Sequence, residues 1–205
     1  MRIVFAIISA GTLATGATLS TAQAADIDPA RVEAIFQAAF KNLPPDMQAR
    51  VDQDQTPAEG SLHRDLPPSD VADAIVEREK ATIKYPESGV LMGDWKVAMK
   101  EANNGYGWRM GDDPKRVVGG NCYACHQLDE KKVAYGNLGP SLLGYGNDRE
   151  IDEELIKATY EKIYNAQSVL ACSQMPRLGK NGYLTPEQIA DYVAMLLDPE
   201  SPVNK

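Results

Sequence analysis

The chain has 205 residues, with 21 basic and 29 acidic side chains and a formal net charge of −8 at pH 7. This acidic balance argues against nucleic acid or an anionic membrane surface as a partner. The length allows one ordinary domain, or a small domain with a large extension.

The first 24 residues have the layout of a secretory signal peptide. Arg2 is followed by an uncharged run that ends in Ala22-Gln23-Ala24, a small-x-small pattern typical of signal peptidase sites. A retained membrane anchor is the alternative, but glycines, serines and threonines dilute the run below the roughly 20 apolar residues of a spanning helix. No later segment is apolar enough to cross a bilayer. We therefore expect an exported, soluble protein in the periplasm, cleaved near Ala24 and without membrane insertion.

Two amphipathic stretches follow the leader. Residues 26–43 are expected to form a helix that has Pro29 in its first turn and apolar side chains at i, i+3, i+4, i+7 and i+8. Residues 69–84 are expected to form a second helix with Ser69 or Asp70 as its cap. The proline-rich residues 44–68 between them predict a loop. The next stretch, up to residue 112, has aromatic residues and glycines but no clear periodicity.

The second half of the chain predicts further helices. A short helix capped by Asp112 or Asp113, with Pro114 in its first turn, is expected to lead to Cys122, and another helix is expected over residues 148–164. The last helix has a capping box formed by Thr185 and Gln188, and Pro199 ends its apolar repeat. No strand-like alternation occurs in this half, so the expected fold class is all-α.

Cys122, Cys125 and His126 form the motif C-x-x-C-H. Two thiols one short turn apart can add to the two vinyl groups of one porphyrin, and the adjacent imidazole then lies beneath the iron as an axial ligand. A redox-active dithiol is one alternative, but it is typical of a βαβ pattern that is missing here. A zinc site is another, but only Cys172 and His63 remain as ligands, far off in sequence. The motif therefore predicts one covalently bound haem c with its iron.

An axial imidazole is best oriented when its second nitrogen donates to a fixed acceptor. Gly139-Pro140 lies shortly after His126 and could supply a backbone carbonyl for this contact. The alternative is that Gly-Pro only makes a turn.

Met175 is the candidate for the sixth iron ligand. It lies between the last two predicted helices in a Met-Pro-Arg-x-Gly loop, where Pro176 would stiffen the approach of its sulfur. The rival is His63, although a lone histidine in a proline-rich loop is usually solvated. A thioether opposite an imidazole raises the reduction potential and closes the iron to small ligands, which favours electron transfer over oxygen or peroxide chemistry.

Cys172 precedes Met175 by three residues and should lie close to the haem edge. It has no partner within the chain if both other cysteines hold the porphyrin. A buried inert thiol is the default, and an intersubunit disulfide, a redox-modified thiol or a competing iron ligand stay open.

With these residues assembled, residues 113–205 resemble class I cytochromes c and, more narrowly, the SoxX family. SoxX proteins are the small monohaem subunits of the SoxAX cytochromes of thiosulfate-oxidising bacteria. The resemblance rests on the motif at 120–126, on Gly-Asn-Leu-Gly-Pro-Ser-Leu at 136–142, and on the long tail from Cys172 with its Met-Pro-Arg loop. Residues 26–110 carry no matching motif.

The resemblance implies that His126 and Met175 are the axial ligands and that Cys122 and Cys125 anchor the haem. It implies a heterodimer with a SoxA-like subunit that carries one or two haems. That enzyme, an L-cysteine S-thiosulfotransferase, joins thiosulfate to a cysteine of the carrier protein SoxY. The catalytic haem lies on SoxA, so no catalytic side chain is assigned here, and an external cytochrome c receives the electrons.

The sequence thus divides into a signal peptide (1–24), a mostly helical extension that is expected to bind the partner (25–112), and a cytochrome c domain (113–205). On this division, a chain without residues 26–105 should keep its haem and lose its partner. An independent soluble monohaem cytochrome c that shuttles electrons between respiratory complexes is the main alternative. A haem sensor or peroxidase is the third, and it needs an open iron coordination site.

Overall fold

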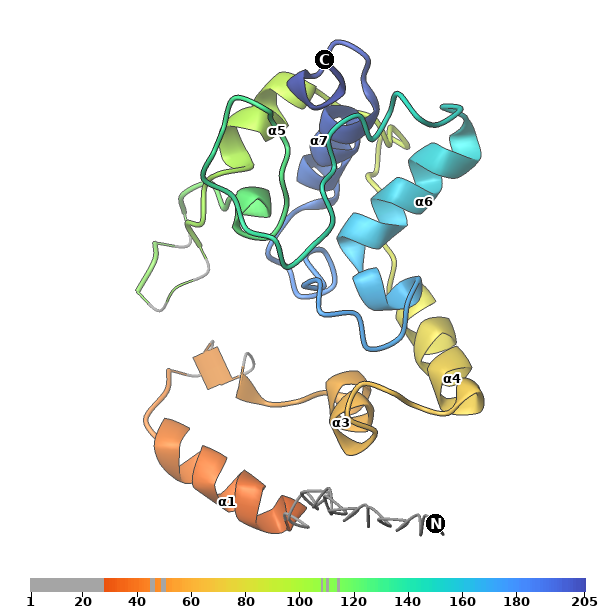
Figure 1. Cartoon of the computed structure of the whole chain (residues 1–205). Helices are drawn as coiled ribbons and strands as arrows, with labels where there is room; N and C mark the ends of the chain where they lie inside the picture. Colours follow the sequence, from red (N-terminus) through yellow and green to blue (C-terminus); the bar gives the residue numbers. More distant parts are fainter. Residues whose placement is uncertain (1–27, 45–46, 49–50, 108, 110, 114) are drawn as a thin grey trace, which may run out of the picture. The chain divides into compact units, whose positions relative to one another are not determined.

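The computed structural model describes residues 28–44, 47–48, 51–107, 109, 111–113 and 115–205. Every regular element in this part of the chain is helical, which confirms the all-α prediction (Figure 1). Contacts divide the chain into two compact units, one up to Pro44 and one from Pro45 to Lys205. Among the described residues, no helix combines the length and apolar character needed to span a bilayer. The leader predicted for residues 1–24 lies outside the described residues.

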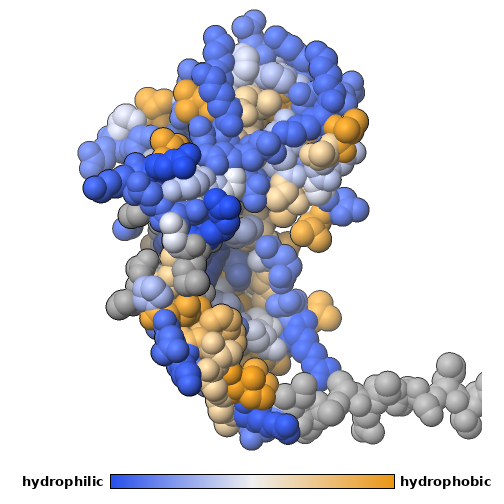
Figure 2. Space-filling model, turned by 90° about the vertical axis from the view of Figure 1, so that its left-hand side faces the viewer, coloured by the Kyte–Doolittle hydropathy of each residue, from blue (hydrophilic) through white to orange (hydrophobic). Residues whose placement is uncertain are grey.

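The first unit contains helix α1 (Pro29–Phe40). Asp28 caps it by accepting a 2.9 Å hydrogen bond from the Ala30 backbone, and Pro29 occupies the first turn as predicted. The helix ends at Phe40, three residues earlier than expected, and none of its side chains is buried. Figure 2 shows apolar side chains at the surface over this helix, and Ile35 is 62% exposed. Within residues 28–44, the part of this unit that the structure describes, the apolar stripe of the helix is therefore left uncovered.

Helix α3 (Gln55–Leu62) lies in the stretch that the sequence predicts to be a loop, so that prediction is wrong over these residues. Asp54 caps the helix with a 3.1 Å hydrogen bond from the Thr56 backbone. Pro57 is its third residue, and a proline is tolerated there because first-turn N–H groups have no partner within a helix. The composition that suggests a loop is compatible with a short, capped helix.

Helix α4 (Ser69–Lys80) confirms the second predicted helix but ends four residues early. Pro68 rather than Ser69 stands at the N-cap position. The helix buries Ile75 and Glu79 and packs against the short 3-10 turn η2 (Ala166–Ser168) of the same unit. This amphipathic face is therefore used within the chain.

Helix α7 (Pro186–Leu197) forms the centre of the second unit. Its predicted capping box is present, with both hydrogen bonds between Thr185 and Gln188. Helix α5 (Trp95–Glu101), in a segment without sequence periodicity, packs against it more extensively than any other element. Ala98 and Ala102 are almost completely buried, and such small residues let two helices approach closely.

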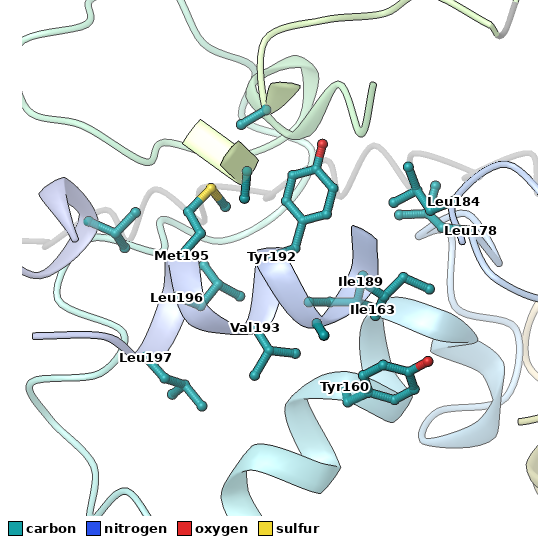
Figure 3. Close-up of a cluster of buried hydrophobic side chains, with 14 of the residues drawn as sticks. Tyr160, Ile163, Leu178, Leu184, Ile189, Tyr192, Val193, Met195, Leu196 and Leu197 are labelled. Carbon is teal, nitrogen blue, oxygen red and sulfur yellow. The ribbon is translucent and has the colours of Figure 1, made fainter. Parts of the chain in front are cut away.

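Helix α6 (Glu153–Tyr164) covers another side of α7. Asp152 caps it through a 2.8 Å hydrogen bond from the Leu155 backbone, so the helix begins five residues later than the stretch that the sequence indicates. Tyr160 is fully buried. Figure 3 shows Tyr192 and Met195 projecting from one side of α7 and Val193 from the other, toward α6. The core of the unit is thus arranged around α7.

The helix expected between its cap at residue 112 or 113 and Cys122 is absent from residues 115–121, which the structure describes. The backbone N–H of Asn121 donates instead to the Asn104 carbonyl at 3.1 Å, and the N–H of Gly119 donates to the Tyr106 carbonyl at 3.2 Å. A Cβ on Gly119 would lie 2.0 Å from the Asn104 oxygen. The segment is therefore held against the chain that follows α5, and this pairing replaces helical hydrogen bonds.

Candidate functional site

The two cysteines and the histidine of the motif lie on one tight turn. The 3-10 turn η1 (Cys122–Ala124) follows Asn121, which has a left-handed backbone with φ of 49°. The Cys122 carbonyl accepts from the backbone N–H of Cys125 at 3.1 Å and of His126 at 2.9 Å. Neither cysteine takes part in a disulfide. The turn therefore presents two thiols and an imidazole within five residues, as attachment of a porphyrin requires.

The alternatives for this motif do not fit the site. Burial raises the pKa of the Cys122 thiol to about 12, whereas the reactive cysteine of a redox dithiol has a lowered pKa. Within the described residues, no group of three or more His, Cys, Asp or Glu side chains is placed to hold a metal ion. The site thus has the donors for a haem, which needs one imidazole and one further ligand beside its two thioether bonds.

The His126 ring is oriented by the backbone of Pro140. Nδ1 lies 2.8 Å from the Pro140 carbonyl oxygen, to which it donates as an N–H. This tautomer leaves Nε2 with its lone pair available to a metal. The contact expected from Gly139-Pro140 is present, and its role toward a bound haem stays a prediction.

Gly139 lets the chain pass close to this imidazole. A Cβ built on Gly139 would lie 2.2 Å from Cε1 of His126 and 2.6 Å from Nδ1. The Gly139 N–H also donates to the Cys125 carbonyl at 2.9 Å. Any side chain at this position would have to displace either the ring or the loop.

We expect Gly139→Ala to lower the haem content of the exported protein, because the new methyl group pushes the imidazole out of position. The measurement is the ratio of Soret absorbance to protein absorbance after purification. Ser141→Ala is the control, since it lies in the same loop and removes only two weak, exposed hydrogen bonds, one donated to Gln127 at 3.2 Å and one accepted from the Leu143 N–H at 3.4 Å. Equal haem content in the two variants would contradict the steric argument.

Tyr192 is a site residue that the sequence places only in the apolar stripe of the last helix. Its hydroxyl accepts a 2.8 Å hydrogen bond from the Gly120 backbone, just before the cysteine motif. A Cβ on Gly120 would lie 2.7 Å from the Tyr192 ring, and burial raises the pKa of Tyr192. The sequence carries no signal for this contact, because the two residues are 72 positions apart.

Met175 lies in the segment between α6 and α7 and is half-buried. Its side chain and that of Cys122 both pack against the hydrophobic core around α7, although the residues lie far apart in the sequence. His63, the rival ligand, stands at the C-terminal end of α3. The structure therefore brings the thioether and the haem-attachment motif to one core.

Residues of α3 and of the Met175 segment line a pocket of about 350 Å³, among them Gly60, Asp65, Cys172 and Met175. Cys172 is a free thiol with a left-handed backbone at φ of 58°. Burial, together with the charge of Asp65, raises the pKa of Cys172. A protonated thiol supports the interpretation of Cys172 as inert.

Comparison with known proteins adds two findings. The family model described as cytochrome c matches residues 112–198. An uncharacterized lipoprotein of Aquifex aeolicus (strain VF5) is 42% identical over 213 residues, which cover 100% of this chain and 98% of that protein. The matched region begins after α5 and ends just past α7.

Proposed function

Because this chain belongs to the cytochrome c family, whose members bind haem c covalently, we propose that it is the electron-transfer subunit of a SoxAX-type enzyme that oxidises thiosulfate. The cytochrome c domain itself makes the chain an electron-transfer protein. When bound, haem c supplies one-electron oxidation and reduction. The role in thiosulfate oxidation is the proposed part.

The residues of the site have separate roles in this proposal. Cys122 and Cys125 would hold the porphyrin covalently, and His126, whose ring is fixed by the Pro140 carbonyl, would bind the iron. Met175 would supply the second iron ligand as a thioether, which would exclude small ligands and specialise the site for electron transfer. No side chain acts as a catalytic group.

The observation that carries the narrower proposal is the long C-terminal tail that resembles SoxX. This tail is an integral part of the fold. The Ser201 hydroxyl donates to the Met195 carbonyl at 2.5 Å, and the Asn204 amide donates to the carbonyls of Leu196 at 3.0 Å and Asp198 at 2.9 Å. These bonds satisfy carbonyls at the end of α7 that lack helical partners. The residues that carry the resemblance to SoxX therefore also help to build the core of the domain, which strengthens the case for this resemblance.

The proposed partners follow from the same resemblance. They are a SoxA-like subunit with one or two haems, the carrier protein SoxY as a transient partner, and an external cytochrome c as acceptor. The exposed apolar stripe of α1 supports the presence of a protein partner, because folded chains seldom leave such a stripe in water. The leader-like residues 1–24 and the lipoprotein relative support export to the periplasm.

The experiment mixes the purified holoprotein with a SoxA-like subunit, SoxY and thiosulfate, and follows the haem absorbance. We expect reduction of this chain only when all three components are present. Reduction without SoxY or without thiosulfate would contradict the proposal. Reduction by a respiratory donor alone, and never by thiosulfate, would favour the independent shuttle instead.

A further inference from the structure

Helix α4 carries a buried carboxylate that receives hydrogen bonds from three separate segments. Glu79 is 1% exposed. It accepts from the Thr56 hydroxyl of α3 and from the Asn165 amide at 2.6 Å. It also accepts from Nη1 of Arg177 at 3.3 and 3.4 Å. A buried charge is costly unless it is paired, so these donors must stay in place in the folded protein.

Arg177 connects this carboxylate to the candidate ligand, because it follows Met175 by two residues. Its side chain is only 11% exposed and also binds Asp54, with Nη2 2.9 Å from Oδ2. Lys180 binds the same Asp54 oxygen at 2.5 Å. Although burial raises the pKa of Asp54, the hydrogen bonds from Arg177 and Lys180 outweigh it and bring that pKa to about 2. Two cations of the Met175 segment are thus held by two carboxylates that precede the cysteine motif.

A second connection holds the other side of Met175. The Gln174 amide donates to Asp65 at 3.0 Å. Gly60 of α3 lies so close to Cys172 that a Cβ on Gly60 would stand 3.2 Å from the Cys172 sulfur. Figure 1 shows α3 and α4 beside the segment that joins α6 to α7. Met175 therefore lies between two points at which its segment is tied to residues 54–79.

We propose that residues 54–79 position the axial methionine, with Glu79 and Asp54 as positioning residues that act on Met175 through Arg177. The inference rests on the proposed assignment of Met175 as the sixth ligand. A loop without these ties samples conformations in which the thioether is away from the iron, and the sixth position is then open to small ligands. The segment before the haem motif thus has a function within the chain, apart from any partner that it binds.

The test uses the haem-loaded protein and two variants. Glu79→Gln keeps the shape of the side chain but removes the charge that binds Arg177. Asp54→Asn removes the carboxylate from Arg177 and Lys180, and asparagine still caps α3. Asp54 is 45% exposed at its side chain, so this variant folds even if Glu79→Gln does not.

Two readouts separate positioning from general stability. One is the weak red absorption band of the oxidised protein that reports sulfur bound to iron, and the other is the rate of carbon monoxide binding to the reduced protein. Loss of a charge-assisted hydrogen bond should raise that rate by about tenfold, which corresponds to about 1.4 kcal/mol. Both variants should also weaken the red band.

Glu59→Gln is the matched control. It breaks a 2.7 Å ion pair between Glu59 of α3 and Arg78 of α4, so it perturbs the same two helices without touching the Met175 segment. Wild-type carbon monoxide kinetics in both Asp54→Asn and Glu79→Gln would overturn the inference. An equal effect of Glu59→Gln would also overturn it, since helix packing would then be the cause.

Met175→Ala distinguishes this inference from its premise. If that variant keeps the red band, the ligand assignment itself fails. If it loses the band while the Asp54 and Glu79 variants behave as wild type, only the positioning role is refuted. Should Glu79→Gln not accumulate, the result for Asp54→Asn decides alone.

Discussion

Met175→Leu is expected to abolish the red sulfur–iron band and to let carbon monoxide bind the reduced protein. Leucine keeps roughly the volume of methionine, so packing against the core is preserved while the coordinating sulfur is lost. The reduction potential should fall, because a thioether opposite an imidazole stabilises the reduced iron, and axial ligands set haem potentials over about 0.8 V. Absorption spectra and a redox titration measure both effects.

Met195→Leu is the control for this variant. Met195 is a methionine of α7 that is 2% exposed and packs in the core, so its replacement tests the loss of a buried sulfur without the loss of a ligand. Its spectrum and potential should stay those of the wild type. A persistent red band in Met175→Leu would refute the assignment and direct the same experiment to His63. Carbon monoxide binding by the unaltered protein would favour the sensor or peroxidase alternative.

The sequence predicts those parts of the molecule that depend on local pattern. The capping box at Thr185 and the C-x-x-C-H turn are defined by residues within a few positions of each other, and both are present. The hydrogen bond between His126 and Pro140 spans only 14 positions and has a visible signal in Gly-Pro. Short-range chemistry of this kind can be derived without knowledge of the fold.

Long-range contacts explain what the sequence does not reveal. Helix α5 has seven residues, too few to show a repeat of apolar side chains at helical spacing. This helix is stabilised by packing against α7, almost a hundred positions later in the sequence. Glu79 looks like a solvated charge on an amphipathic helix, because its partners Asn165 and Arg177 are 86 and 98 positions away. The contact between Tyr192 and Gly120 cannot be predicted from the sequence for the same reason, because these residues are 72 positions apart.

Removal of residues 25–105, with the leader kept for export, is expected to prevent accumulation of a folded haem protein. This replaces the sequence-based expectation that a chain without residues 26–105 keeps its haem. The deletion removes Ile75, Ala98 and Ala102, which are at most 1% exposed, and it uncovers the face of α7 on which α5 packs. It also leaves Arg177 and Lys180 without their carboxylates. One large core side chain contributes about 2–5 kcal/mol, and a whole domain is stable by only about 5–15 kcal/mol.

The matched control is removal of residues 25–44, which ends at the boundary between the two compact units and leaves the unit from Pro45 to Lys205 intact. This variant should keep its haem, its thermal unfolding temperature and its resistance to protease. Equal protease resistance and haem content in the longer deletion would contradict the role of α5 and α4 in the core. Because the family match begins only at residue 112, a chain reduced to that region lacks the helix that packs on α7. The part of this protein that folds therefore extends well beyond the part that its family signature covers.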